Sequence, residues 1–526
     1  MRFKQSNVAL ILLGSLLGAC GGGNTFPTPA LEWQQGRFEK SASFKDRCEL
    51  PRSGSDASGN AYPDKDGSLV YEKMWLRSWS YESYLWYSEI DDVNPNDFAT
   101  PQAYFDVLKT QQSGVEDRPK DAFHYYVDTA EFELQSEAGV NVNYGLGLSL
   151  YGEGESSLLQ VTYVEPNSPA SAAELNISRG ATIYSINNRA VGTYTGAELA
   201  ALIEPGVANQ SLILELADTE LASQVNQATA TRTVTLVSAA YYSSPVLQFN
   251  SNVAPASSSR VAYMAFNSFI SSAQDTLIDR FNEMQANNVT ELVLDLRYNG
   301  GGLLHLSSQL AYMISGKSSS DTYFQFIYND KSPSGEILPF VDTKIDYAAG
   351  ETLAQKLPSL ELDRVFIIAN EGTCSASEAL INGLRGVGVH VHLVGEQTCG
   401  KPYGFIPEDN CGTTYFTIQF RGINDVGFGD YANGFAPMGS SGGGYKIPGC
   451  PAIDDLSKEL GDATEASLST ALSFIDDGKC ASGTPPATTT ASSGSGSFSK
   501  SAAEPLKPSL IGGDKIIDNM IWEPIQ

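Results

Sequence analysis

The chain has 526 residues, which is too long for a single hydrophobic core, so we expect two or three domains with terminal tails. Hydrophobic residues make up 42% of the sequence and aromatic residues 10%, a composition typical of a globular protein. The formal net charge of −28 argues against binding to nucleic acid, which requires clustered lysine and arginine. With only four histidines in the chain, we expect neither a metal nor a cofactor.

The first 20 residues have the pattern of an export signal. Basic residues at the start are followed by an apolar run over 8–17, too short to span a bilayer, and then by small residues before Cys20. This pattern resembles a bacterial lipobox, in which the cysteine is lipidated; an ordinary signal peptide is the alternative. Residues 21–63 read as a tether and irregular linker. We expect an exported lipoprotein, facing the periplasm or the cell surface and anchored in the outer membrane.

Six cysteines remain after Cys20, and an even number in an exported chain indicates disulfide bonds. They are Cys48, Cys374, Cys399, Cys411, Cys450 and Cys480. Six cysteines allow 15 pairings, so the sequence leaves the connectivity open. None of the spacings is that of a CxxC zinc site.

Residues 64–137 are expected to form a small helical region. Apolar residues recur at helical spacing over 73–90, ending with Trp86 and Ile90, and predict one amphipathic helix. Thr100 followed by a proline predicts a second helix over 101–111. We interpret the aromatic face as core packing in preference to a peptide-binding surface.

Residues 138–243 resemble a PDZ domain. The matching pieces are YGLGLSL at 144–150, the turn EPNSPA at 165–170 and RGATIYSINNRAV at 179–191. The resemblance implies that an extended peptide adds as a strand, with its terminal carboxylate near the backbone of Leu146 and Gly147. A β-rich domain without a ligand is the alternative.

Residues 244–480 alternate between strand and helix patterns, which predicts a sheet-based α/β core. The predicted strands are 261–266, 292–296, 365–369 and 389–394, and the predicted helices are 274–287 and 303–314. Residues 481–526 form a low-complexity tail that is too poor in apolar residues to fold alone. The fold class is therefore mixed α/β and multidomain, with a helical N-terminal region and a β-rich domain before the core.

Two turns in this core carry chemistry. A buried strand runs into three glycines at 300–302, whose N–H groups at the start of a helix suit an oxyanion; no P-loop lysine follows. A second strand runs into a turn of small residues that contains Ser375. A serine nucleophile needs a base, and no histidine has a defensible spacing. Lys401 can serve if burial and hydrogen bonding lower its pKa.

Three motifs in combination resemble the C-terminal-processing (tail-specific) serine peptidases, in which a PDZ domain precedes the catalytic core. They are LDLRxNGGG, then G-x-x-S-A-S-E, then V-G-E-x-T-x-G-K, within a resemblance over 75–476. The resemblance implies that Ser375 is the nucleophile, in preference to Ser377, because the family motif places the nucleophile first. Lys401 then matches the general base.

The resemblance also implies an oxyanion hole made by the N–H of Ala376 and that of Gly300 or Gly301. The sequence departs from the family pattern in three places. Ser375 and Lys401 are 26 residues apart, about one more than expected, which requires a small bulge or insertion within 386–392. Phe405 stands where the family often has glutamine, and cysteines at 374 and 399 bracket the pair and could bridge it.

We therefore expect a serine-type endopeptidase that cleaves polypeptides near their C-terminal ends through a Ser-Lys dyad and an acyl-enzyme. The competing hypothesis is a catalytically impaired, lipid-anchored peptide-binding adaptor on the same scaffold. A third and weaker hypothesis, a carbohydrate-binding surface lipoprotein, draws on the aromatic N-terminal helix. The sequence leaves the substrate and the oligomeric state open.

Overall fold

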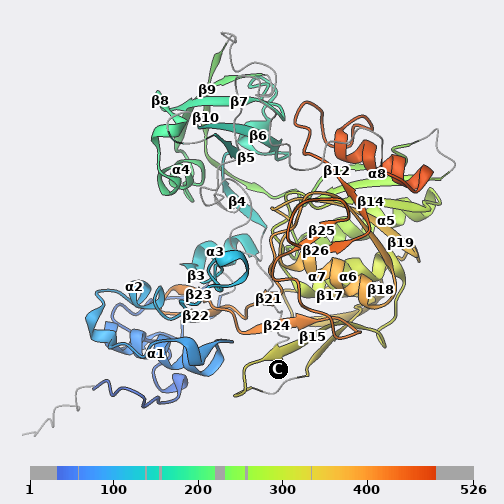
Figure 1. Ribbon diagram of the computed structural model, residues 1–526. Helices are drawn as coiled ribbons and strands as arrows, with labels where there is room; N and C mark the ends of the chain where they lie inside the picture. The colour runs from blue at the N-terminus through green and yellow to red at the C-terminus, as the bar shows by residue number, and fades with distance from the viewer. Residues whose placement is uncertain are drawn as a thin grey trace, which may run out of the picture.

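The computed structural model describes residues 32–480, apart from 57–58, 137–138, 153, 155–156, 219–230, 255–258 and 333–334. The predicted signal segment, with Cys20, and the predicted tail over 481–526 lie outside the described residues. Figure 1 shows a helical N-terminal region, a β-rich module and an α/β core in chain order. The predicted α/β class is confirmed. Within the described residues, each helix is too short or too polar to cross a membrane.

The helices are α1 Leu69–Ser83, α2 Pro101–Phe105, α3 Thr129–Ser136, α4 Gly196–Ile203, α5 Ala273–Ala286, α6 Leu304–Ser315, α7 Ala376–Gly386 and α8 Ala466–Asp477. The strands before the core are β1 Arg47–Cys48, β2 Lys65–Asp66, β3 Tyr125–Asp128, β4 Val140–Asn143, β5 Leu146–Tyr151, β6 Leu158–Val164, β7 Thr182–Ile186, β8 Arg189–Ala190, β9 Ser211–Ala217, β10 Arg232–Val237 and β11 Ala239–Tyr242. The strands of the core are β12 Val246–Asn250, β13 Val261–Phe266, β14 Glu291–Asp295, β15 Thr322–Tyr328, β16 Ile337–Pro339, β17 Thr343–Asp346, β18 Glu351–Lys356, β19 Arg364–Ala369, β20 His390–Gly395, β21 Tyr403–Gly404, β22 Glu408–Asn410, β23 Thr413–Phe416, β24 Phe420–Ile423, β25 Phe435–Pro437, β26 Tyr445–Ile447 and β27 Gly449–Pro451.

The core is built on a six-stranded sheet in the order β12-β13-β14-β19-β20-β27, parallel except for β12 at one edge. Successive residues of a strand face opposite sides, and both sides are covered, as parallel sheets require. Leu294 and Ile367 share a buried cluster with α5, α6 and α7. Val293 and Phe366, their chain neighbours, share another cluster with Leu468 of α8.

The topology brings three loops together at one edge of this sheet. β14, β19 and β20 are neighbouring parallel strands, so the loops that follow their carboxyl ends lie side by side. β19 and β20 pair without a register shift, so the bulge expected within 386–392 does not fall in the strand. The chain turns at 387–389 instead, where Gly388 has a φ of 83°.

The N-terminal region is held together by aromatic packing. Trp75 and Trp79 stack with their ring centroids 5.2 Å apart and are almost fully buried, which confirms the core-packing interpretation. The first helix is shorter than predicted: it ends at Ser83, and Trp86 and Ile90 lie beyond it. The cause is Tyr84, whose extended backbone lets its buried hydroxyl donate to Asp121 over 2.8 Å.

The second helix begins as predicted, with the Thr100 side chain accepting the N–H of Ala103 over 3.1 Å, but it ends at Phe105 and not at residue 111. Strand pairing and a disulfide are among the connections between this region and the core. β3 pairs with β23, and Cys48 forms a disulfide with Cys411. The N-terminal region is therefore fixed to the chain that follows the lysine turn.

The β-rich module has its own sheet, in the order β10-β9-β7-β6-β5, and a hydrophobic cluster of its own that includes α4. β4 and β11 pair where the chain enters and leaves the module. Arg179 crosses to the core, donating to Asp454, to the backbone of Lys458 and to the hydroxyl of Tyr298. Because Tyr298 lies two residues before the first of the three glycines, this contact connects the module with the loop after β14.

Candidate active site

Ser375 lies in the turn between β19 and α7, at the residue that precedes the helix. Its backbone has φ 63° and ψ −117°, a conformation that costs a residue with a side chain about 1–3 kcal/mol. The side chain is fully buried, and its hydroxyl has no hydrogen-bond partner among the residues that the structure describes. Such strain persists only where the surroundings impose it, and it is typical of functional sites.

The glycine loop is fixed against this turn by Asn299. Its side-chain N–H donates to the backbone oxygen of Phe266 over 3.1 Å. Its backbone oxygen accepts the N–H of Cys374 and the hydroxyl of Ser377, each over 3.1 Å. The loop after β14 and the turn after β19 are therefore bonded directly to each other.

Gly301 must be a glycine because a Cβ atom there would lie 2.7 Å from the Cβ of Ser375. Its φ of 120° also disfavours any side chain. Its N–H already donates to the side chain of Asn299 over 2.9 Å, which favours Gly300 over Gly301 as the oxyanion donor. Ala376 is the first residue of α7, a position whose N–H has no acceptor within a helix.

Glu378, one turn into α7, connects the serine turn to the lysine turn. Its fully buried carboxylate accepts the backbone N–H groups of Ser375, Gly400 and Lys401 over 3.2, 2.9 and 2.7 Å, and also the hydroxyl of Thr398. Burial raises the pKa of Glu378, and these donors oppose that rise because they stabilise the charged form. Glu378 is the last residue of the motif G-x-x-S-A-S-E, and its role in joining the two turns was not predicted from the sequence. The S-x-x-E spacing of a capping box was the signal that could have found its role.

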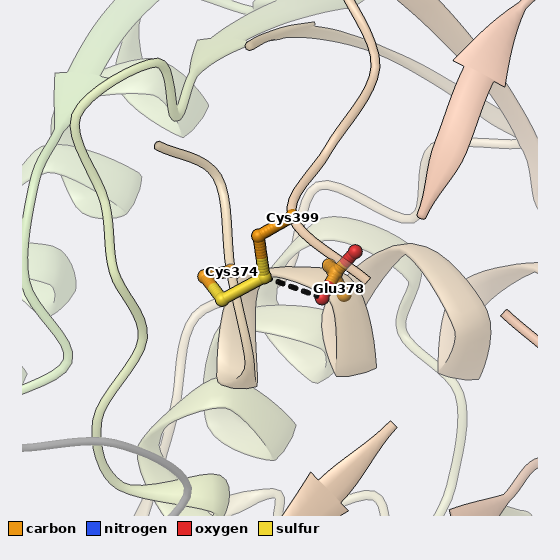
Figure 2. A group of neighbouring side chains, drawn as sticks. All are labelled: Cys374, Glu378 and Cys399. Carbon is orange, nitrogen blue, oxygen red and sulfur yellow. Dashed lines mark hydrogen bonds between the residues drawn. A yellow bond between two sulfur atoms is a disulfide. The ribbon is translucent and has the colours of Figure 1, made fainter. Parts of the chain in front are cut away.

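A disulfide makes the same connection. Cys374, next to Ser375, is bonded to Cys399, two residues before Lys401, and the N–H of Cys399 donates to the oxygen of Thr373 over 3.1 Å. Figure 2 shows the disulfide beside Glu378, and the Cys399 sulfur lies 3.3 Å from a carboxylate oxygen. A sulfur in a disulfide has no hydrogen to donate, so this last approach is a contact and not a hydrogen bond.

Lys401 is fully buried among aromatic rings. Its Nζ lies 4.2 Å from the ring centroid of Phe405 and 4.9 Å from that of Phe123. Phe405, where the family often has glutamine, also packs edge to face against Tyr125 and Phe416. It therefore forms part of an apolar wall around the amine.

A cavity of about 680 Å³ borders the lysine turn. Cys399, Gly400 and Tyr403 line this cavity. Residues 112–115 and Phe123, from the N-terminal region, also line it. A molecule in this cavity is therefore in contact with the turn that holds Lys401.

The surroundings of His124, His305 and His392 suit structural roles in the fold. His392 stacks on Phe366 and lies against Phe474 of α8, as expected for a residue on a packed strand face. His124 stacks on Phe105, and burial lowers the pKa of His124 to about 4. Burial likewise lowers the pKa of His305, early in α6, to about 4.

Comparison with known proteins identifies peptidases that are similar to this chain. Residues 260–404, which contain all three loops, match the model of peptidase family S41. Over 258 residues the chain is 26% identical to a carboxyl-terminal-processing protease of Picosynechococcus sp.; the alignment covers 49% of this chain and only 54% of that relative. A crystal structure of an S41 protease from Bacteroides fragilis shares the fold, with a TM-score of 0.57 and 22% identity over 79% of this chain and 97% of that one.

The family match covers the strands that carry the glycine loop, Ser375 and Lys401, and the resemblance predicted from the sequence motifs is confirmed. The segment that carries the three loops is therefore similar to the S41 peptidases.

Proposed function

We propose that the chain is a serine-type endopeptidase in which Ser375 is the nucleophile and Lys401 the general base. Ser375 attacks a peptide carbonyl, and Lys401 takes its proton and returns it to the leaving amine. Water then hydrolyses the acyl-enzyme. The observation that carries the proposal is the shared set of contacts to Glu378, which holds the backbones of both residues in one buried site.

The surroundings of Lys401 suit a base, which must be uncharged to accept a proton. Burial of an ammonium group can cost several kcal/mol, whereas attraction to one aromatic ring returns about 0.5–2 kcal/mol. The apolar wall formed by Phe405 and Phe123 therefore supports a neutral amine. On this reasoning Phe405 maintains the base and does not mark an inactive site.

We propose Gly300 and Ala376 as the oxyanion donors. The engagement of the Gly301 N–H by Asn299 supports Gly300. Gly301 then serves the site by being small, since a side chain there would fill the space beside Ser375. Donors fixed before the reaction stabilise the developing charge without reorganisation.

We propose that the β-rich module is a PDZ-like domain that holds the C-terminal segment of the substrate. β5 is the edge strand of its sheet, so its outer edge is suited to pairing with an added peptide strand. Leu146 and Gly147 begin this strand, where the carboxylate is expected. The polypeptide class of substrate follows from the family match; export and lipidation at Cys20 remain predictions from the sequence.

Changing Ser375 to alanine should abolish peptide hydrolysis and labelling by a fluorophosphonate probe, because only an activated serine reacts with it. Mass spectrometry of the labelled wild-type chain should place the adduct on Ser375. The Ser377→Ala variant is the matched control and should still label at Ser375. Labelling that persists in Ser375→Ala would refute the nucleophile, and an unlabelled wild-type chain would support the adaptor hypothesis.

Changing Lys401 to alanine should lower kcat/KM by about 10²–10⁴-fold, the usual contribution of a general base. Hydroxide replaces the missing amine, so the residual activity should rise with pH where the wild-type rate is level. The measurement is a pH profile of both forms. Residual activity that falls or stays constant with rising pH would contradict the role of base.

Changing Glu378 to glutamine should reduce kcat by about a hundredfold, because an amide NH2 cannot accept the N–H groups that the carboxylate accepts, and the two turns shift. KM should change little, since Glu378 is buried and positions the dyad without touching substrate. Exposed Glu371, on the same loop, provides the control Glu371→Gln. Equal kcat values for wild type and Glu378→Gln would exclude the positioning role.

A peptide with a free C-terminal carboxylate should bind the Ser375→Ala chain about tenfold or more tightly than the same peptide amidated at its C-terminus, because the amide removes a charge-assisted hydrogen bond. Fluorescence anisotropy of a labelled peptide measures both affinities. Equal affinities would contradict recognition of the terminus by the β-rich module.

A further inference from the structure

Cys374, Cys399 and Glu378 form a cluster whose chemistry the peptidase reaction does not use. One potential ligand atom from each residue lies within 4.8 Å of the other two, and Figure 2 shows the three side chains next to one another. The two cysteines are 25 residues apart and come from different turns, so their spacing in the sequence did not predict the cluster.

The bonded form of this cluster cannot bind a metal, since thiolates are required and the two sulfurs are bonded to each other. Reduction changes that. The sulfurs must then separate beyond bonding distance, toward the roughly 3.8 Å that two thiolates keep on one tetrahedral zinc ion. Cys399 is already 3.3 Å from the carboxylate, close to the spacing of a sulfur and an oxygen that share a zinc ion.

We propose that Cys374, Cys399 and Glu378 form a Zn²⁺ site that becomes available when their disulfide is reduced, and that binding of the ion switches the Ser-Lys dyad off. Two thiolates and one carboxylate are three ligands of a kind that zinc accepts, and water supplies the fourth. Hard cations such as Mg²⁺ and Ca²⁺ prefer all-oxygen sites and are not expected to bind.

The ion can reach the site from solvent. Both cysteines are partly exposed, and Cys399 lines the cavity of about 680 Å³. A phosphine reduces the disulfide in two steps. Its phosphorus attacks one sulfur, and the other sulfur leaves as a thiolate. Water then cleaves the phosphorus–sulfur bond, which releases the second thiol and converts the phosphine to its oxide. Zn²⁺ then displaces the thiol protons as it binds.

Inactivation follows from the other partners of Glu378. A carboxylate oxygen that binds zinc is drawn away from the N–H groups of Ser375 and Lys401, which it accepts in the oxidised chain. The two turns then lose the contacts that align them. The effect on activity rests on the proposed function, whereas the binding of metal does not.

The test uses the full chain, reduced with a water-soluble trialkylphosphine and titrated with Co²⁺ as a spectroscopic substitute for zinc. We expect one Co²⁺ per chain, with a thiolate-to-cobalt absorption band in the near ultraviolet that Zn²⁺ abolishes. The oxidised chain and the double variant Cys374→Ser/Cys399→Ser should show no band. The matched control Cys450→Ser/Cys480→Ser, which removes another disulfide, should keep it.

The absence of the band in the reduced wild-type chain would overturn the site, as would an equal band in the Cys374→Ser/Cys399→Ser variant. If that variant does not fold, reduced wild-type chain alkylated with iodoacetamide replaces it and should bind no Co²⁺. In activity assays, Zn²⁺ should slow the reduced enzyme about a hundredfold, reversibly with a chelator, and leave the oxidised enzyme unchanged. A cobalt band without inhibition by Zn²⁺ would refute the proposed control of activity by zinc. A cobalt band in a chain that never hydrolyses peptide would refute the proposed function but would still support the metal site.

Discussion

The buried carboxylate of Glu378 is the constraint on which the site depends. A charge without water is costly unless donors surround it, and here the donors come from the serine turn and the lysine turn. Moving either turn leaves part of that charge unsatisfied, at a cost of about 1–3 kcal/mol or more for each lost bond. The disulfide between Cys374 and Cys399 adds a covalent connection between the same two turns.

The parallel sheet explains why these turns can meet. β14, β19 and β20 end at one edge, so residues far apart in the chain become neighbours without long excursions. Asn299 then bonds the first loop to the second, and Glu378 bonds the second to the third. The strained backbone of Ser375 is held in place by this double attachment, which offsets its cost.

The sequence predicted the elements of the core well, because buried strands and amphipathic helices leave regular apolar patterns; β13 was predicted to the residue. It overextended the first helix because the spacing of Trp86 continues the helical pattern by coincidence, while the buried bond from Tyr84 to Asp121 that ends the helix is a tertiary contact. The shared role of Glu378 was missed for the same reason, since two of its donors, Gly400 and Lys401, lie more than 20 residues away. The pairing of the cysteines was left open because it depends on which turns meet.

A crystal structure of the chain with a peptide boronic acid would test most directly whether Ser375, Lys401 and the glycine loop act as one site. We expect a covalent bond from boron to the Ser375 oxygen, one boronate oxygen within about 3 Å of the N–H groups of Gly300 and Ala376, and the Lys401 amine within hydrogen-bond reach of the Ser375 oxygen. A boronate bonded to another residue, or bonded to Ser375 with Lys401 out of reach, would contradict the account.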